Sequence, residues 1–127
     1  MNEKINLLIP CAGKSQRFFD EGFKKHKFFL PCINNSTIIE NIIGSFNKKI
    51  FKPHIILSKN QINLYQSELS LMKERFPELL IHSIEEHDLG PTYSVMQIKI
   101  PENERIIVHY CDFLTEFKQD YLIDLIL

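Results

Sequence analysis

The sequence has 127 residues, of which 44% are hydrophobic and 24% are charged, values typical of a one-domain globular protein. Its net charge of −1 provides no field that would draw the protein to nucleic acid or to an anionic membrane, and its apolar runs are too short to span a bilayer. We therefore expect a single domain over residues 1–127 with neither nucleic-acid nor membrane partners.

The cysteines and the N-terminus indicate the cellular compartment. Cys11, Cys32 and Cys111 are odd in number and widely spaced, a pattern that predicts neither a disulfide framework nor a metal site. The first residues, Met1–Lys4, lead directly into an apolar strand and lack the architecture of a signal peptide. These features predict a cytoplasmic protein with reduced thiols.

Secondary structure in the first half follows from hydrophobic periodicity. Ile5–Ile9 is apolar without alternation, as in a strand buried on both faces of a parallel sheet. Pro10–Lys27 has two glycines, many charges and little periodicity, which predicts a long functional loop before the brief apolar segment Phe28–Leu30. Ser36 and Thr37 are typical of a helix start. The predicted inner face of that helix is Ile38, Ile39, Ile42, Ile43 and Phe46.

In the second half, apolar strands continue to alternate with helices. Three further strands and three further helices are predicted, in the order His54–Leu57, Gln61–Phe76, Leu79–Ile84, Pro91–Ile98, Arg105–His109 and Lys118–Leu127. The inner face of the second of these segments is predicted to be Leu64, Leu69, Met72 and Phe76. Pro91 is compatible with the first turn of its helix.

This alternation predicts the fold class and the place of the site. Strands that alternate with helices form a mainly parallel sheet with right-handed crossovers, here a Rossmann-like three-layer α/β/α fold. Ligands of such folds bind outside the carboxyl ends of the strands, where the loops after Ile9 and Val108 lie. A sheet of four strands keeps an exposed edge. We therefore expect the chain to be the front part of a larger fold or to form a homo-oligomer.

The small-residue loop after the first strand allows several interpretations. Gly13-Lys14-Ser15 matches the end of a P-loop, but Leu8 stands where that motif needs its first glycine. The dinucleotide fingerprint needs three glycines, of which only Gly13 is present. In a purely structural interpretation, Gly13 forms a turn and Arg17 is a solvated charge. The charges of Arg17 and Lys27, combined with small residues that let backbone N–H groups approach an anion, favour a phosphate site.

A family resemblance develops this hypothesis. The run Cys11-Ala12-Gly13-Lys14-Ser15-Gln16-Arg17, followed by His26-Lys27, resembles the Ala-Ala-Gly-x-Gly-x-Arg and Pro-Lys motifs of sugar-phosphate nucleotidyltransferases. The segment 18–23 resembles members linked to capsule and surface-polysaccharide synthesis. Cys11, Ser15 and His26 depart from the family pattern. The resemblance extends over nearly the whole chain but only about the first half of a family domain, which implies a truncated nucleotidyltransferase (glycosyltransferase-A-like) fold.

The resemblance also implies residue roles. Arg17 and Lys27 would be the catalytic cations, holding the β- and γ-phosphates and the α-phosphate respectively, and Asp112, at the end of a strand, would hold Mg²⁺. Asp112 could instead be a helix cap or a turn residue, and Gly90 could simply begin a helix. The implied nucleotide-binding residues are Ala12, Gly13, Lys14 and Ser15 at the phosphates, and Gly90, Thr92 and Tyr93 near the base.

The expected reaction is Mg²⁺-dependent transfer of a nucleoside monophosphate from a nucleoside triphosphate to a phosphorylated small-molecule acceptor, with release of pyrophosphate. CTP is preferred over UTP and dTTP as the donor, and the products would be precursors of capsule or surface polysaccharide. Two other hypotheses remain. One is a catalytically incomplete nucleotide-binding or interaction module that assembles through its open sheet edge. The other is a phosphotransferase that uses Lys14 and Ser15.

Overall fold

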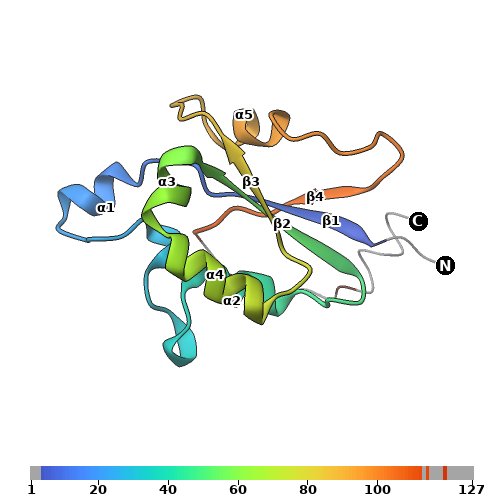
Figure 1. The fold of residues 1–127 in the computed structure, drawn as a ribbon, viewed down its shortest axis with the longest axis horizontal. Helices are drawn as coiled ribbons and strands as arrows, with labels where there is room; N and C mark the ends of the chain where they lie inside the picture. The colour runs from blue at the N-terminus through green and yellow to red at the C-terminus, as the bar shows by residue number, and fades with distance from the viewer. Residues whose placement is uncertain (1–3, 113, 115–118, 120–127) are drawn as a thin grey trace.

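A parallel sheet forms the centre of the molecule. The computed structural model describes residues 4–112, 114 and 119, and within them four strands pair in the order β3-β2-β1-β4 (Figure 1). Every pairing is parallel, with Leu8 of β1 opposite both His54 of β2 and Val108 of β4. The strands are β1 (Ile5–Pro10), β2 (Phe51–Ser58), β3 (Leu80–Ile84) and β4 (Ile106–Val108).

Helices cover both faces of this sheet. In Figure 1, α2, α3 and α4 lie on one face and α5 lies on the other. The predicted three-layer α/β/α architecture is therefore confirmed. The helices of the described residues are α1 (Gln16–Asp20), α2 (Ile38–Ser45), α3 (Lys59–Leu64), α4 (Gln66–Arg75) and α5 (Pro91–Met96), with 3-10 turns η1 (Lys27–Phe29) and η2 (Ile33–Asn35).

Apolar burial explains why β1 is central. All six of its residues are buried. Leu7 and Ile9 belong to the main hydrophobic cluster beneath α2, α3 and α4. A smaller cluster of Ala12, Ile56 and Ile84 packs with residues of and beside α5 on the other face. Because side chains alternate along a strand, β1 contributes to both layers.

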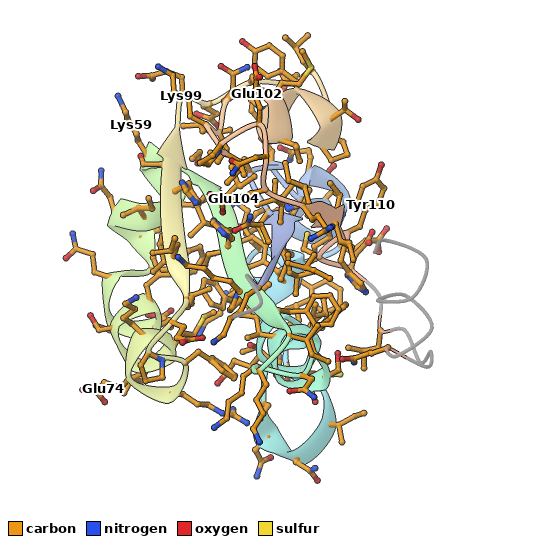
Figure 2. The ribbon with its side chains drawn as sticks, turned by 90° about the vertical axis from the view of Figure 1, so that its right-hand side faces the viewer. Lys59, Glu74, Lys99, Glu102, Glu104 and Tyr110 are labelled. Carbon is orange, nitrogen blue, oxygen red and sulfur yellow. The ribbon has the colours of Figure 1, made fainter. Side chains whose placement is uncertain are left out.

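The α5 face also carries a row of polar side chains. Asn6, His54 and His82 lie side by side across β1, β2 and β3, joined by contacts of 2.8 Å. The Asn6 amide donates to the carboxylate of Glu104, whose side chain lies over the strands in Figure 2. The two sheet faces therefore differ in chemistry, one apolar and the other partly polar.

The predicted helix start near Thr37 is confirmed. Thr37 is the N-cap of α2 and forms a capping box with Glu40: each side chain accepts a backbone N–H of the other residue. Ile39, Ile42 and Ile43 form the buried face of the helix.

The prediction of one helix over Gln61–Phe76 is wrong, because the chain forms two helices that meet at Tyr65. The Tyr65 backbone, at φ −116° and ψ 30°, is not helical. Its ring packs on Phe29 and its hydroxyl accepts the His26 N–H at 3.0 Å. These tertiary contacts draw Tyr65 into the core. Leu64, predicted to face inward, is 60% exposed.

Other predicted boundaries change as well: β3, α5 and β4 are each shorter than predicted. The stretch predicted as a loop over Pro10–Lys27 begins inside β1 and contains α1. The strand predicted as His54–Leu57 extends over Phe51–Ser58. Pro53 made this strand look shorter, because proline cannot donate to a ladder. Its nitrogen faces the β3 side, where pairing begins only at His54.

The predicted C-terminal helix, Lys118–Leu127, lies outside the described residues apart from residue 119. Over residues 4–112, 114 and 119, no helix combines the length and the apolarity that crossing a bilayer requires.

Candidate active site

A small cavity lies where β1 and β4 end. Its volume is about 280 Å³. Three separate parts of the sequence and the single residue Lys27 line it, and they include most of the predicted site. The lining residues are Pro10, Cys11, Ala12, Gly13, Lys14, Lys27, His87, Asp88, Gly90, Pro91, Ser94, Tyr110, Cys111 and Asp112. This is the position at which parallel α/β sheets bind ligands.

A larger cavity of about 810 Å³ lies elsewhere, against α2 and the start of β2. Its walls include Leu7, Ile43 and Phe51. None of the predicted site residues lines it, and a large volume alone does not indicate a functional site. We therefore place the candidate site in the smaller cavity.

Lys27 and Asp112 meet in this cavity. The Lys27 ammonium lies 3.3 Å from Oδ2 of Asp112, although 85 positions separate them in the sequence. Their side chains are 27% and 43% exposed. A pair this exposed contributes at most about 1 kcal/mol to stability. A charged ligand could therefore replace this ion pair and bind either side chain.

The loop after β1 presents backbone to the same cavity. Ala12 is buried, whereas Gly13 and Lys14 are exposed. Ser15 has φ 56°. This is the left-handed region that glycine enters without steric cost, so the chain keeps a glycine-like turn with a serine in the position of the motif glycine. The Ser15 hydroxyl accepts the Lys27 backbone N–H at 3.2 Å and so connects the loop to the start of η1.

Gln61 holds this loop in place. Its buried side-chain amide donates to the carbonyl oxygens of Cys11 (3.0 Å) and Gly13 (3.1 Å). Its carbonyl oxygen accepts the Ser58 N–H in the capping box that begins α3. Gln61 was predicted only as a helix residue and not as part of the site. The spacing Ser58-x-x-Gln61 was the available signal, since it marks a helix start directly after a strand.

The segment before α5 forms the opposite wall. Gly90 has φ 90°, which favours glycine, and Pro91 is the first residue of α5. His87 Nδ1 accepts the Leu89 N–H at 3.0 Å, so Nε2 carries the proton and donates to the Ser94 hydroxyl at 2.8 Å. Neither His87 nor Ser94 was predicted, and no sequence signal singled them out.

The other predicted residues are less central. The Tyr93 ring packs edge-on against His87 with ring centres 4.5 Å apart, and neither Tyr93 nor Thr92 lines the cavity. Lys14 bridges to Asp88 at 3.2 Å, so its charge joins the two walls. Arg17 belongs to α1, but its side chain lies outside the described residues.

The geometry does not form a P-loop. That motif needs a glycine-rich turn to begin at Leu8. Leu8 instead lies within β1, paired on both sides, and is only 1% exposed. The phosphotransferase hypothesis therefore has no structural basis.

Two buried thiols adjoin the Lys27–Asp112 pair. The Cys11 thiol donates to the Ile9 carbonyl oxygen at 3.4 Å. Burial raises the pKa of the Cys11 thiol well above its ordinary value, and the neighbouring Cys111 adds to this effect. Interaction with the Cys11 side chain lowers the pKa of Cys111, and the positive charge of Lys27 acts in the same direction.

Comparison with known proteins shows the fold. No protein-family model and no curated protein matches the sequence. Among solved structures, the chain is similar to a nucleoside-diphosphate-sugar pyrophosphorylase from Vibrio cholerae RC9, with a TM-score of 0.62 and 17% identity over 87% of this chain and 50% of that one. It is similar to UDP-glucose pyrophosphorylase complexed with UDP-glucose, with a TM-score of 0.58 and 18% identity over 87% of this chain and 46% of that one.

A third solved structure supports the same conclusion. Rv0371c from Mycobacterium tuberculosis H37Rv has a TM-score of 0.57 and 13% identity over 87% of this chain and 53% of its own. The chain thus spans about half the length of these proteins. At these identities the likeness establishes a common fold, and the predicted nucleotidyltransferase fold is confirmed.

Proposed function

We propose that the protein is a nucleotidyltransferase that transfers a nucleoside monophosphate from a nucleoside triphosphate to a phosphorylated small molecule. The observation that carries this proposal is the Lys27–Asp112 pair beside the loop of Ala12 to Ser15. It places an ammonium, a carboxylate and a glycine-containing loop at the ligand-binding edge of the sheet. The fold shared with two pyrophosphorylases supports the same chemistry.

The reaction needs no protein nucleophile. An oxygen of the acceptor phosphate attacks the α-phosphorus, the bond from that phosphorus to the β-phosphate oxygen breaks, and pyrophosphate leaves. The protein contributes positioning and charge neutralisation. Lys27 stabilises the negative charge that develops at the α-phosphate. The loop of Ala12 to Ser15 binds the phosphates. Arg17, in α1 directly after this loop, binds the leaving pyrophosphate.

Magnesium fits this arrangement as an ion that arrives with the triphosphate. The part of the chain that the structure describes contains no group of three or more metal-ligating side chains. Mg²⁺ commonly binds nucleotides through one or two carboxylates with phosphate oxygens and water completing its shell, and Asp112 lines the cavity with a partly exposed carboxylate. When bound there, the ion would neutralise charge on the phosphate oxygens.

The donor and pathway assignments extend the proposal. We assign CTP as the preferred donor over UTP and dTTP, with the base on the side of Gly90 and Tyr93. The products would be precursors of capsule or surface polysaccharide. Both assignments rest on the likeness of residues 18–23 to the capsule-linked transferases.

Substitution of Lys27 tests the proposal. Pyrophosphate release is measured with Mg²⁺, a panel of triphosphates and phosphorylated sugar and sugar-alcohol acceptors. Lys27→Ala is expected to lower turnover by about two to three orders of magnitude, because a preorganised cation contributes about 3–4 kcal/mol in the transition state. Lys24→Ala, an exposed change in the same segment outside the cavity, is the matched control. Equal rates for wild type and Lys27→Ala would refute the assignment.

The same panel separates transfer from binding alone. The chain spans about half the length of its structural neighbours, which favours a nucleotide-binding module as the second candidate function. In this case a triphosphate at about a hundred times its Kd stabilises the fold by about 2.7 kcal/mol, and no acceptor yields pyrophosphate. Assembly through the outer edge of β4 would then appear as a larger species in sedimentation.

A further inference from the structure

Cys11 and Cys111 follow the ends of the neighbouring strands β1 and β4. Leu8 and Val108 are the last recorded partners of the β1–β4 pairing, and the His109 N–H extends this ladder to the Leu8 carbonyl at 3.0 Å. Cys11 and Cys111 each lie three positions beyond that pair. Adjacent strands are about 4.7–4.9 Å apart. This separation lies within the range of about 4.4–6.8 Å between Cα atoms that disulfides require.

Their side chains also meet. Both cysteines belong to the same buried cluster and both line the candidate active-site cavity, and each side chain shifts the pKa of the other. Their residues are only 2% and 6% exposed, so the cavity is the route by which a small reagent would reach them. Cys32, the third cysteine, is half-buried and is not part of this lining. Cys11 and Cys111 therefore differ from Cys32 in two ways: they lie beside each other, and both line the same cavity.

We propose that Cys11 and Cys111 form a redox modification site, at which a small hydroperoxide closes an intramolecular disulfide across the floor of the candidate active site. The step is balanced with hydrogen peroxide as oxidant. Each thiol gives up one hydrogen, the two sulfurs bond to each other, the peroxide O–O bond breaks, and two water molecules form. Dithiol reductants reverse the reaction by thiol–disulfide exchange.

Closure would alter the proposed nucleotide site. Ala12 follows Cys11 directly and Asp112 follows Cys111 directly. A sulfur–sulfur bond of about 2.0 Å is shorter than any non-bonded contact between thiols, so it draws these two segments together. If the cavity binds a triphosphate, as proposed above, the oxidised protein accommodates it less well. This consequence rests on the proposed function, whereas disulfide formation does not.

Peptide mapping of the wild-type chain tests the modification. The protein is treated with increasing hydrogen peroxide, denatured in the presence of an alkylating reagent, and digested without reduction. We expect a single cross-linked pair of peptides joining Cys11 to Cys111, lighter by two hydrogens than the reduced peptides. Cys32 is expected to remain alkylated, and a dithiol reductant restores all three free thiols. The same treatment in denaturant is expected to form the link more slowly, because the strands no longer align the two sulfurs.

Several outcomes would overturn the inference. The first is that Cys11 and Cys111 both remain open to alkylation after Cys32 has been oxidised. The second is that cross-links form between chains in place of the internal link. The third is that the internal link forms at the same rate in the folded and the unfolded chain. Cys32→Ser is the matched variant and should form the link as the wild type does. Cys11→Ser should form none. The wild-type map decides the question even where Cys11→Ser fails to fold.

Thermal shifts with nucleotide separate this inference from the proposed function. We expect CTP with Mg²⁺ to stabilise the reduced protein and to stabilise the oxidised protein less, with dithiol treatment restoring the shift. Absence of any shift in the reduced protein would count against the proposed function and leave the disulfide result standing. An equal shift in both forms would refute the link between the disulfide and the site.

Discussion

The sheet interior and the loops at its carboxyl edge differ in how they are held. In β1 every residue is buried, and Leu7 and Ile9 are packed among apolar side chains. Past the buried Cys11 and Ala12, Gly13 and Lys14 are exposed, and Ser15 adopts a left-handed turn. Burial of apolar side chains stabilises the interior, whereas hydrogen bonds and exposed ion pairs fix the conformation of the loops. We infer that stability and ligand binding reside largely in different residues, and four predictions test this separation.

The largest expected effect lies in the interior. Leu7 is completely buried between β1 and the helices. Leu7→Ala removes that packing and leaves a cavity, so we expect the free energy of unfolding to fall by about 2–5 kcal/mol. Denaturant titration measures the loss. Leu71→Ala is the matched control, since Leu71 is 66% exposed and should change stability by less than about 0.5 kcal/mol. A similar loss from both variants would contradict the assignment of the core.

The next effect should appear in both regions, because Gln61 connects them. Gln61→Leu keeps a buried side chain at this position but removes its amide, so the Cys11 and Gly13 carbonyl oxygens lose their donor. Unsatisfied buried groups cost about 1–3 kcal/mol, so we expect a loss of about 2 kcal/mol in stability. Because the loop loses its tether, the thermal shift with triphosphate should also fall.

Gln66→Leu serves as the control for this change. Gln66 is an exposed residue of α4, so its substitution should leave both the unfolding free energy and the nucleotide shift nearly unchanged. If Gln61→Leu lowered stability while the nucleotide shift stayed at its wild-type size, the loop would not depend on this tether, and the two regions would be more independent than we infer.

Sequence predicted the interior better than the loops. The buried strand near Ile5–Ile9 and the helix after Thr37 were both found, because apolar runs and capping residues act locally. The break at Tyr65 was missed, because its cause is contact with His26, 39 positions away. No local pattern records such a contact.

The candidate site shows the same limit. Lys27 could be selected as a motif lysine and Asp112 as a carboxylate after a strand, yet only the sheet order places them 3.3 Å apart. His87 gave no signal, since an isolated histidine occurs in most loops, and Ser94 lies in the predicted helix without any feature that marks it. Cys11 was recorded as a small departure from a motif. Its position opposite Cys111 emerged only from the pairing of β1 with β4.

The polar row on the α5 face gives the third prediction, a dependence of stability on pH. Burial lowers the pKa of His54 from its ordinary 6.5 to about 4, and the neighbouring His82 adds to this effect. The Asn6 oxygen faces Nε2 of His54, so Nε2 carries the proton and Nδ1 accepts from His82. A second proton on His54 would break this chain of hydrogen bonds. The folded state therefore favours neutral His54.

The sign of the effect follows from proton binding. Between pH 6.5 and 4, the unfolded chain binds a proton at His54 that the folded chain does not, so stability falls as the pH falls. The slope from this one group is at most about 1.4 kcal/mol per pH unit. Burial lowers the pKa of His26 and His82 as well, with the same sign. Unfolding free energies at pH 7, 6 and 5 should therefore decrease less steeply for His54→Gln than for the wild type, and equal slopes would contradict the prediction.

The smallest expected effect concerns the capping box at the start of α2. Thr37→Ala removes the hydroxyl that accepts the Glu40 N–H, so we expect a loss of about 1 kcal/mol in unfolding free energy. Glu40→Gln retains a side chain able to complete the capping box while it removes the ion pair with Arg75 at 2.9 Å. Because that pair is partly exposed, Glu40→Gln should cost less than Thr37→Ala, and both variants should keep the nucleotide shift of the wild type. A reduced nucleotide shift in either variant would show that the packing of α2 reaches the carboxyl-edge loops, and the separation between stability and binding would then fail.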